Sequence, residues 1–254
     1  MGRIIAIANQ KGGVGKTTTA VNLASILAYS GKRILLIDSD PQGNVATSLG
    51  IEKKTLESGV YDLLMQEAAV EKTIMKTRVA GMDFIPATVD LVGAQVELVG
   101  EMGREYRLMN GLKPIVDSYD IIFIDCPPEL GLLTLNALAA ADAVLIPIQC
   151  EYLALDGLTQ LLETVKLVKK NLNPKLAIEG VLLTMYDVRT NLSNQVVEEV
   201  TAYFKEKTYK TIIPRNVRLS EAPSHGKPVI DYDKDSIGAK SYRDLAEEFL
   251  RRME

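Results

Sequence analysis

Short runs of consecutive apolar residues recur along the chain and are separated by longer stretches of mixed polarity. Apolar runs without polar positions are typical of strands that are buried on both faces of a sheet. Such strands are expected at residues 4–8, 34–37, 121–124, 143–148 and 177–183. The longer stretches have the composition and length of helices. Helices are expected at residues 17–29, 104–117, 132–141, 155–170 and 191–204, the last capped by Asn191 or Ser193.

Strand and helix patterns interleave as β-α-β-α, which predicts a parallel sheet with helices packed on it. No linker, repeat or low-complexity tract interrupts this order, and 254 residues suit one sizeable domain. The predicted fold class is therefore α/β. We expect a single domain over residues 1–254, with a mostly parallel central sheet flanked by helices on both faces.

A final helix is expected near residues 236–253. Its apolar residues form one stripe, made of Tyr242, Leu245, Ala246, Phe249 and Met253. The opposite face carries charges of both signs, whereas a helix that lies on a membrane surface usually carries an excess of Lys and Arg. We therefore expect this helix to pack on the protein core, and we expect no stable membrane binding.

Composition narrows the possible chemistry. Hydrophobic residues make up 47% and charged residues 24% of the chain, as in ordinary soluble proteins. A single histidine argues against His-based metal sites, and Cys126 and Cys150 lack metal-ligand spacing, so a metal would need oxygen ligands. The N-terminal apolar run is too short for a secretory or membrane segment, which predicts a cytoplasmic protein. The net charge is −4, yet residues 165–230 contain eleven Lys/Arg against six Asp/Glu, which is compatible with a local anion-binding face.

The strongest motif is N-Q-K-G-G-V-G-K-T-T at residues 9–18, between a predicted strand and a predicted helix. This is the context of a P-loop, in which backbone N–H groups and a helix N-terminus surround phosphates. We expect Lys16 to reach the β- and γ-phosphates and the Thr17 hydroxyl to bind Mg²⁺. The predicted phosphate cradle consists of Lys11, Gly12, Gly13, Val14, Gly15, Lys16, Thr17 and Thr18.

Acidic residues follow two other predicted strands at their carboxyl ends, where α/β sheets place their ligands. Asp38 and Asp40 come after residues 34–37, and Asp125 comes after residues 121–124. Asp125 is expected to hold Mg²⁺ through its water shell, with Asp38 supporting the metal shell. Asp40 is the candidate for orienting the attacking water. A helix-capping role is the alternative for each, and it is more reasonable for Asp38 than for Asp125.

The P-loop departs from the common pattern because Gln10 replaces the first glycine and a second lysine, Lys11, lies inside the loop. It resembles the K-G-G-x-G-K-[ST] box of the family that contains ParA, MinD and the nitrogenase iron protein. In that family this lysine points across a dimer interface to the partner's nucleotide. The resemblance therefore implies ATP as the nucleotide, a homodimer bridged by ATP, and Lys11, Lys16 and Asp40 as the catalytic residues.

Two further segments resemble the ParA/Soj branch of the family: D-P-Q-G-N at residues 40–44 and I-P-R-N-V-R-L-S-E-A-P-S-H-G-K-P at residues 213–228. The similarity spans essentially the whole chain. It implies that Pro214 and Asn216 border the adenine, and that Arg189 and Arg218 contact double-stranded DNA without sequence preference. A more speculative extension of the DNA-binding patch comprises Lys205, Lys207, Lys210 and Lys227.

The resemblance predicts an ATP-dependent dimerising switch that binds the nucleoid and hydrolyses ATP slowly when a ParB-type, centromere-binding partner stimulates it. Chromosome or plasmid segregation is the expected role. Because the P-loop begins by Lys11, no preceding helix-turn-helix domain is expected, and Glu129 stands where the family often has a smaller residue. The alternatives are a MinD-like membrane-surface ATPase, an iron–sulfur reductase and a relative with another cargo. The first requires a basic C-terminal helix and the second requires the family's cluster-binding cysteines, and this sequence has neither pattern.

Overall fold

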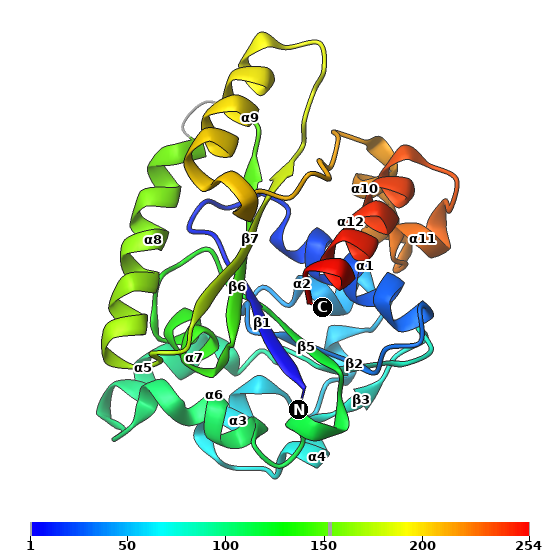
Figure 1. Ribbon diagram of the computed structural model, residues 1–254. Coiled ribbons are helices and arrows are strands. Elements are labelled where there is room, and N and C mark those ends of the chain that lie inside the picture. The colour runs from blue at the N-terminus through cyan, green and yellow to red at the C-terminus, as the bar shows by residue number, and fades with distance from the viewer. Residues whose placement is uncertain (1, 152–153, 254) are drawn as a thin grey trace.

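The computed structural model describes residues 2–151 and 154–253, and within these residues seven strands form one sheet in the order β3-β4-β2-β5-β1-β6-β7 (Figure 1). All neighbouring strands run parallel except the pair β3 and β4. The strands are β1 (Arg3–Ile7), β2 (Ile34–Asp38), β3 (Met75–Lys76), β4 (Met82–Ile85), β5 (Ile121–Asp125), β6 (Ala143–Gln149) and β7 (Ala177–Thr184).

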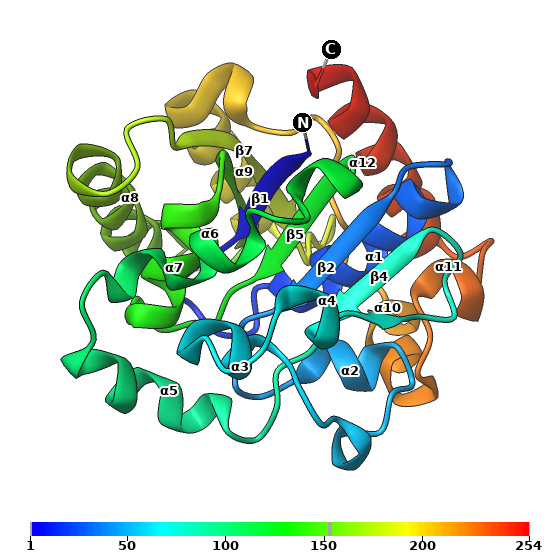
Figure 2. The same cartoon turned by 90° about the horizontal axis from the view of Figure 1, so that it is seen from below.

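Helices cover both faces of this sheet, as the two views at right angles show (Figures 1 and 2). They are α1 (Lys16–Tyr29), α2 (Asn44–Ser48), α3 (Val60–Met65), α4 (Val70–Thr73), α5 (Leu91–Glu97), α6 (Arg107–Leu112), α7 (Leu132–Ala140), α8 (Ala154–Asn171), α9 (Asn191–Phe204), α10 (Val217–Glu221), α11 (Val229–Tyr232) and α12 (Ile237–Met253). The predicted fold class, α/β with a mostly parallel sheet between two helical layers, is confirmed.

The sheet separates two hydrophobic cores, and β1 shows how its sequence supplies both. Successive side chains of a strand point to opposite faces. Ile4 and Ala6 accordingly belong to the core under α3, α7 and α8, whereas Ile5 and Ile7 belong to the core under α1 and α12. All four residues are buried. A continuous apolar run is therefore required here, because neither face of the strand reaches water.

The five strands that the apolar runs predict are all present, within one residue at either end. Strands β3 and β4 were not predicted, because they are only two and four residues long and a charged residue, Asp83, interrupts the apolar pattern of β4. The prediction of one helix over residues 104–117 is wrong: α6 ends at Leu112, and short 3₁₀ turns flank it. Pro114 accounts for the interruption, because proline lacks the N–H that a helix requires and disfavours helical geometry at the preceding residue.

Helix α9 has the predicted bounds but a different cap. Thr190, one residue before the helix, accepts a hydrogen bond from the backbone N–H of Ser193 through its side chain, at 3.3 Å. Ser193 thus supplies the donor of the capping interaction, and neither of the predicted caps, Asn191 or Ser193, occupies the N-cap position.

Helix α12 packs on the core, as its apolar stripe predicts. Tyr242, Leu245, Ala246 and Phe249 are buried, and the Tyr242 hydroxyl lies 3.1 Å from that of Thr19 on α1. The apolar stripe of α12 is therefore covered by the protein's own core. Across the described part of the chain, no helix combines the length and the apolar character needed to span a membrane.

Candidate functional site

The loop between β1 and α1 is shaped by two glycines with positive φ angles, Gly13 at 74° and Gly15 at 89°. Residues with a Cβ rarely adopt this left-handed region, so glycine permits the tight curve that leads into the N-terminus of α1. The Nζ of Lys16 lies 3.3 Å from the carbonyl oxygen of Lys11. The lysine side chain therefore bends back over its own loop, toward the space that phosphates occupy in a P-loop.

Hydrogen bonds to the neighbouring strands β6 and β7 hold this loop in place. The side-chain amide of Asn9 donates to the carbonyl oxygen of Pro147 on β6 at 2.7 Å, and its oxygen accepts from the N–H of Lys11 at 3.0 Å. At the end of β7, the Thr184 hydroxyl donates to the carbonyl oxygen of Val14 at 2.9 Å. The sequence analysis did not identify Thr184; its only signal is its position at the carboxyl end of a parallel strand, the edge where such sheets bind ligands.

Two predicted acidic residues meet at this edge. Asp38 of β2 and Asp125 of β5 are register partners on adjacent strands, and both are buried. Burial raises the pKa of Asp125 to about 7, and burial and the charge of Asp125 raise the pKa of Asp38 well above its usual value. The structure thus places two buried carboxyl groups side by side, where negative charge on either one is costly.

Lys16 and Thr17 face this charge. The Thr17 hydroxyl donates to Oδ2 of Asp125 at 2.6 Å, and Oδ1 of the same carboxylate is buried without a hydrogen-bond partner. Burial lowers the pKa of Lys16, while the charges of Asp125, Cys126 and Asp40 act in the opposite direction. Lys16, Thr17, Asp38 and Asp125 therefore lie together at this edge of the sheet.

These oxygen donors fit Mg²⁺. Within the described residues, no group of three or more His, Cys, Asp or Glu side chains forms a metal cage. Mg²⁺ typically uses one or two protein oxygens and completes its octahedron with phosphates and water, so a dedicated cage is not required. The Thr17 hydroxyl and the unpartnered Oδ1 of Asp125 are hard donors of this kind. Asp38 is less free, because its two oxygens accept the N–H groups of Asp40 and Val45, both at 3.1 Å.

Asp40 lies in the turn that links β2 to α2. Its Oδ1 accepts the N–H of Gln42 at 2.9 Å and its carbonyl accepts the N–H of Gly43 at 2.8 Å. The residue is largely buried, at 8% exposure. The turn thus holds the carboxylate near Lys16 and Asp125, on which its charge acts electrostatically.

The residues predicted to border the adenine lie on the segment that follows β7. Pro214 forms a parallel bridge with Tyr186, and the Asn216 side chain caps α10 by accepting the N–H of Arg218 at 3.0 Å. Arg215, between them, forms an ion pair with Glu151 at 2.6 Å. This pair joins the segment to the loop after β6, and nothing in the sequence pattern indicated it.

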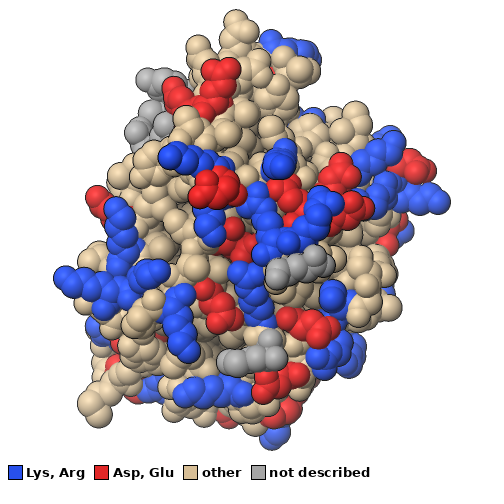
Figure 3. All heavy atoms as spheres, viewed as in Figure 1, with Lys and Arg blue, Asp and Glu red and all other residues tan. Residues whose placement is uncertain are grey.

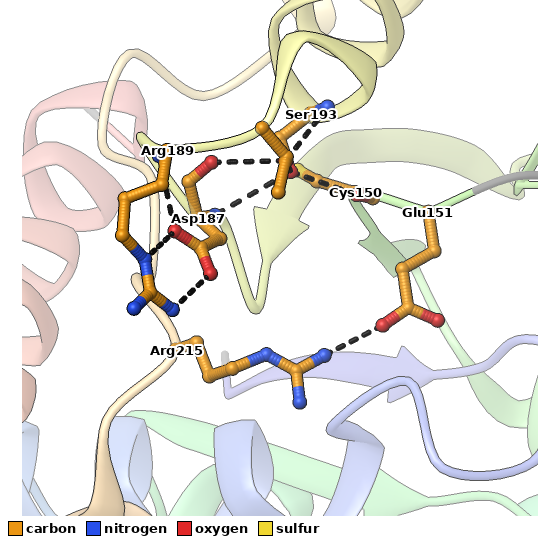
Figure 4. A network of polar contacts seen from close by, with 7 residues as sticks. Cys150, Glu151, Asp187, Arg189, Ser193 and Arg215 are labelled. Carbon is orange, nitrogen blue, oxygen red and sulfur yellow. Dashed lines mark hydrogen bonds and ion pairs between the residues drawn. The ribbon is translucent and has the colours of Figure 1, made fainter.

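The predicted DNA-contacting arginines are exposed, and both are paired with acids of the same chain. Arg189 binds Asp187, and Arg218 binds Glu221 at 2.8 Å and Asp233 at 3.2 Å. Figure 4 shows the Arg189 loop beside Cys150, Glu151 and Arg215. The Ser193 hydroxyl donates to the carbonyl oxygen of Cys150 at 3.0 Å, next to Glu151 and its partner Arg215.

Three of the four lysines proposed to extend the arginine patch, Lys205, Lys207 and Lys210, lie away from Arg189. Lys205 and Lys207 lie beyond the C-terminus of α9, whereas Arg189 precedes its N-terminus (Figure 1). A helix of 14 residues separates them by about 21 Å. Lys207 and Lys210 instead line a cavity of about 910 Å³ beside α12, together with acidic residues. The space-filling view shows blue and red side chains intermixed over this region rather than a uniform basic face (Figure 3).

Comparison with known proteins identifies the family. A family model described as AAA domain matches residues 2–178. The chain is 63% identical over 248 residues to the sporulation initiation inhibitor protein Soj of Bacillus subtilis, covering 98% of each chain. It is 55% identical to the chromosome partitioning protein ParA of Myxococcus xanthus, covering 99% of this chain and 89% of that one. The chain belongs to the ParA/Soj family.

Solved structures agree with this assignment. Cobyrinic acid a,c-diamide synthase from Mycobacterium smegmatis, solved with bound ADP and magnesium, has a TM-score of 0.87 and 38% identity; the match covers 100% of this chain and 96% of that one. The septum site-determining protein MinD from Pyrococcus horikoshii, complexed with Mg-ADP, has a TM-score of 0.80 and 27% identity, with 98% and 96% covered. ParA/Soj proteins and these neighbours share the P-loop architecture described above.

Proposed function

We propose that the protein is an ATP-dependent switch in chromosome or plasmid partitioning. In this proposal ATP and Mg²⁺ bind at the loop of residues 11–18, two chains dimerise around ATP, and the dimer binds DNA without sequence preference. Hydrolysis, stimulated by a ParB-type partner, then releases the DNA. Support comes from the 63% identity to Soj and from the juxtaposition of Lys16, Thr17 and Asp125 at one edge of the sheet.

The chain's own groups suit the binding of a triphosphate. Lys16 is buried and donates toward the phosphates, and the backbone N–H groups of the loop surround them as in other P-loops. Thr17 and Asp125 hold Mg²⁺, which neutralises phosphate charge when bound. Asp40 orients the water that attacks in line with the leaving oxygen, and Lys11 donates to the nucleotide of the other chain. Lys11 and Lys16 then stabilise the charge that develops on the transferred group.

The binding of the adenine and of DNA is assigned to the segments around the same edge. Pro214 and Asn216 border the base, and Arg189 and Arg218 contact DNA phosphates. Arginine contacts to phosphates release counterions, so the affinity should fall steeply as salt rises and should depend little on DNA sequence. From these assignments we infer that the protein is cytoplasmic and that its ATP-bound form associates with the nucleoid.

Binding of duplex DNA by Asp40→Ala protein tests the proposal. This variant should retain ATP without hydrolysing it and should therefore accumulate as the ATP-bound dimer. Fluorescence anisotropy at low salt, in ATP and in ADP, should show binding only in ATP and equal affinity for unrelated sequences. Arg218→Glu in the same background serves as the control and should abolish the binding.

Two outcomes separate the parts of this proposal. Normal ATP turnover by Asp40→Ala would remove Asp40 from the mechanism. If Asp40→Ala retains ATP but binds DNA in neither nucleotide, the ATPase assignment still holds. The binding target of the dimer would then be a membrane surface or another cargo instead of DNA. Light scattering of the same samples shows whether the dimer formed, so a failure of dimerisation is distinguished from a failure to bind DNA.

A further inference from the structure

A groove runs between α8 and α9 beside the beginning of β7, remote from the P-loop. It comprises a cavity of about 530 Å³ and a second of about 220 Å³, which share Leu162, Lys166 and Tyr203. Its floor is apolar and consists of Leu158, Leu162, Val165, Leu176, Ile178 and Phe204. Such a continuous apolar floor on the surface is typical of a site that binds another molecule.

Tyr203 forms one wall of the groove. Its side chain is 69% exposed, and its ring packs against Phe204 in an edge-on arrangement with 4.8 Å between ring centroids. Phe204 is 8% exposed and fixes the position of the more exposed ring. A tyrosine held in this way offers a large apolar area at a low cost in conformational entropy, which is why tyrosine is enriched among the residues that dominate interface energetics.

The rim of the groove is basic. Lys166 and Lys169 extend from the same side of α8, three positions apart, and Lys207 flanks the groove beyond the end of α9. Glu163 is the acidic residue among the lining side chains. The protein as a whole has a net charge of −4, so this excess of positive charge is a local feature. An occupant with negative charges beside an apolar surface is complementary to it.

We propose that this groove binds a short amphipathic helix of a partner protein, with apolar anchors on one face and acidic residues beside them. From Leu158 to Lys169 the groove follows α8 for about 16 Å, which is the length of three helical turns. An apolar stripe with anchors at positions i, i+3 or i+4 and i+7 matches an apolar groove of that length. The acidic residues of the partner then lie opposite Lys166, Lys169 and Lys207.

The shape and lining of the groove favour a protein over the other anionic partners. DNA presents phosphates but no aliphatic surface that would cover the floor around Leu162 and Phe204. A membrane surface is broad, and a peripheral protein contacts it with apolar side chains that project outward, whereas these side chains line a concavity. A helix supplies both the apolar stripe and the flanking charges that the groove requires.

The groove also lies at the opposite edge of the sheet from the nucleotide site. Ala177 and Ile178 line it at the start of β7, whereas Thr184 contacts the P-loop at the end of the same strand. The strand is eight residues long, about 26 Å from end to end. Occupation of the groove therefore does not require ATP, and the proposal goes beyond the partitioning switch: it holds or fails independently of ATP hydrolysis and DNA binding.

A selection experiment with a library of 16-residue helical peptides tests the proposal. Full-length protein in ADP is the target, and sequences that bind it are measured by fluorescence anisotropy. We expect the selected peptides to be acidic, with apolar residues at the spacing given above. Their affinity should fall at least tenfold for Tyr203→Ala and for Lys166→Glu. Lys175→Glu, which makes the same charge change outside the groove, should bind them as tightly as the original protein.

Several results would overturn the proposal. Selected peptides that are basic, or whose affinity is unchanged in both Tyr203→Ala and Lys166→Glu, would show that the groove does not bind acidic helices. Concentration-dependent dimerisation in ADP that Tyr203→Ala abolishes would identify a second copy of the chain as the occupant instead. Displacement of bound peptide by duplex DNA, lost in Lys166→Glu, would assign the groove to nucleic acid. Circular dichroism of the variants confirms that each is folded.

Discussion

Asp187 holds the guanidinium of Arg189 through two hydrogen bonds, from Nε at 2.9 Å and from a terminal nitrogen at 2.6 Å (Figure 4). The backbone N–H of Arg189 adds a third, to Oδ1 of Asp187 at 3.0 Å. Hydrogen bonds from the Arg189 side chain and backbone lower the pKa of Asp187 well below its usual value. The arginine side chain is 81% exposed, so it faces solvent while its charge is balanced within the same loop.

This pairing predicts that Asp187→Asn strengthens DNA binding. A DNA phosphate must compete with the Asp187 carboxylate for the guanidinium, and exposed ion pairs are weak enough to exchange. In ATP and low salt, the affinity of the Asp40→Ala dimer for duplex DNA should rise about threefold when Asp187→Asn is added. The change removes a negative charge, so the affinity should also depend more steeply on salt.

Glu198→Gln on α9 is the matched control, because it changes the net charge of the protein by the same amount on an exposed site. Anisotropy titrations at several salt concentrations compare the two variants. An equal gain for both would mean that net charge alone is responsible. Unchanged affinity in Asp187→Asn would mean that Arg189 does not contact DNA or that the pair persists in the complex.

A second prediction concerns the stability of the nucleotide-free protein. Asp125 is buried beside Asp38, and burial raises its pKa to about 7. The folded-state pKa lies above the ordinary value of 3.8, so the ionised group disfavours folding to its full extent above pH 7, and this stability is regained as pH falls from 7 toward 4. Asp125→Asn removes the buried charge and still accepts the hydrogen bond from Thr17. At pH 8 in EDTA it should stabilise the protein by about 2 kcal/mol and raise Tm by about 4–8 °C.

Calorimetry at pH 8 and pH 6 measures this effect, which should be smaller at the lower pH. Addition of Mg²⁺ and ATP should stabilise the original protein and stabilise Asp125→Asn much less, because the metal's carboxylate is gone. A lower Tm for Asp125→Asn at pH 8 would show that the charge of Asp125 is compensated in the folded protein. Lys16 is the group in a position to compensate it.

The sequence predicted those parts of the molecule that depend on local or strongly periodic patterns. Buried parallel strands such as Ile121–Asp125 are continuous apolar runs because both faces are covered, and the P-loop has a fixed spacing of glycines and lysine. Pro114 also indicates from the sequence that α6 ends before it, but the prediction gave more weight to the helical pattern over residues 104–117. In contrast, β4 is recognisable only from its pairing with β2, which is a tertiary relationship.

The contacts that complete the site were beyond prediction for the same reason. Thr184 and Val14 are 170 positions apart in the chain, and Arg215 and Glu151 are 64 apart. Only the order of the strands brings them together, because β6 lies between β7 and β1, the strand that leads into the P-loop. The sequence analysis also grouped Lys207 with Arg189 in one basic patch, although the helix that it predicted over residues 191–204 already separates the two residues.

The two lysines of the P-loop should have separable roles. Lys16 is buried and bends over the loop, so Lys16→Ala should reduce nucleotide affinity by at least a hundredfold. Lys11 is only half-buried, and its proposed target is the nucleotide of the other chain. Lys11→Ala should therefore bind ATP within a few-fold of the original affinity and fail to dimerise.

Fluorescent-nucleotide titration and light scattering, each in the Asp40→Ala background, distinguish these outcomes. ATP-dependent dimers of Lys11→Ala would show that the lysine is not required across the interface. A large loss of nucleotide affinity in monomeric Lys11→Ala would place its action within its own chain, contrary to the role that the family resemblance implies.

The hydrogen bond between Thr184 and Val14 supplies the last prediction. The Thr184 hydroxyl is buried and donates at 2.9 Å to a carbonyl of the P-loop, so Thr184→Val keeps the volume of the side chain and leaves that carbonyl unpaired. Loss of the bond should destabilise the protein by about 1–2 kcal/mol and loosen the loop that surrounds the phosphates. Thr73→Val is the matched control, because its hydroxyl is also buried and donates to a carbonyl, that of Val70 at 2.8 Å, within α4. Both variants should unfold at lower denaturant concentration, but only Thr184→Val should bind ATP several-fold more weakly. Equal ATP affinity in the two variants would show that β7 supports the fold and does not position the P-loop.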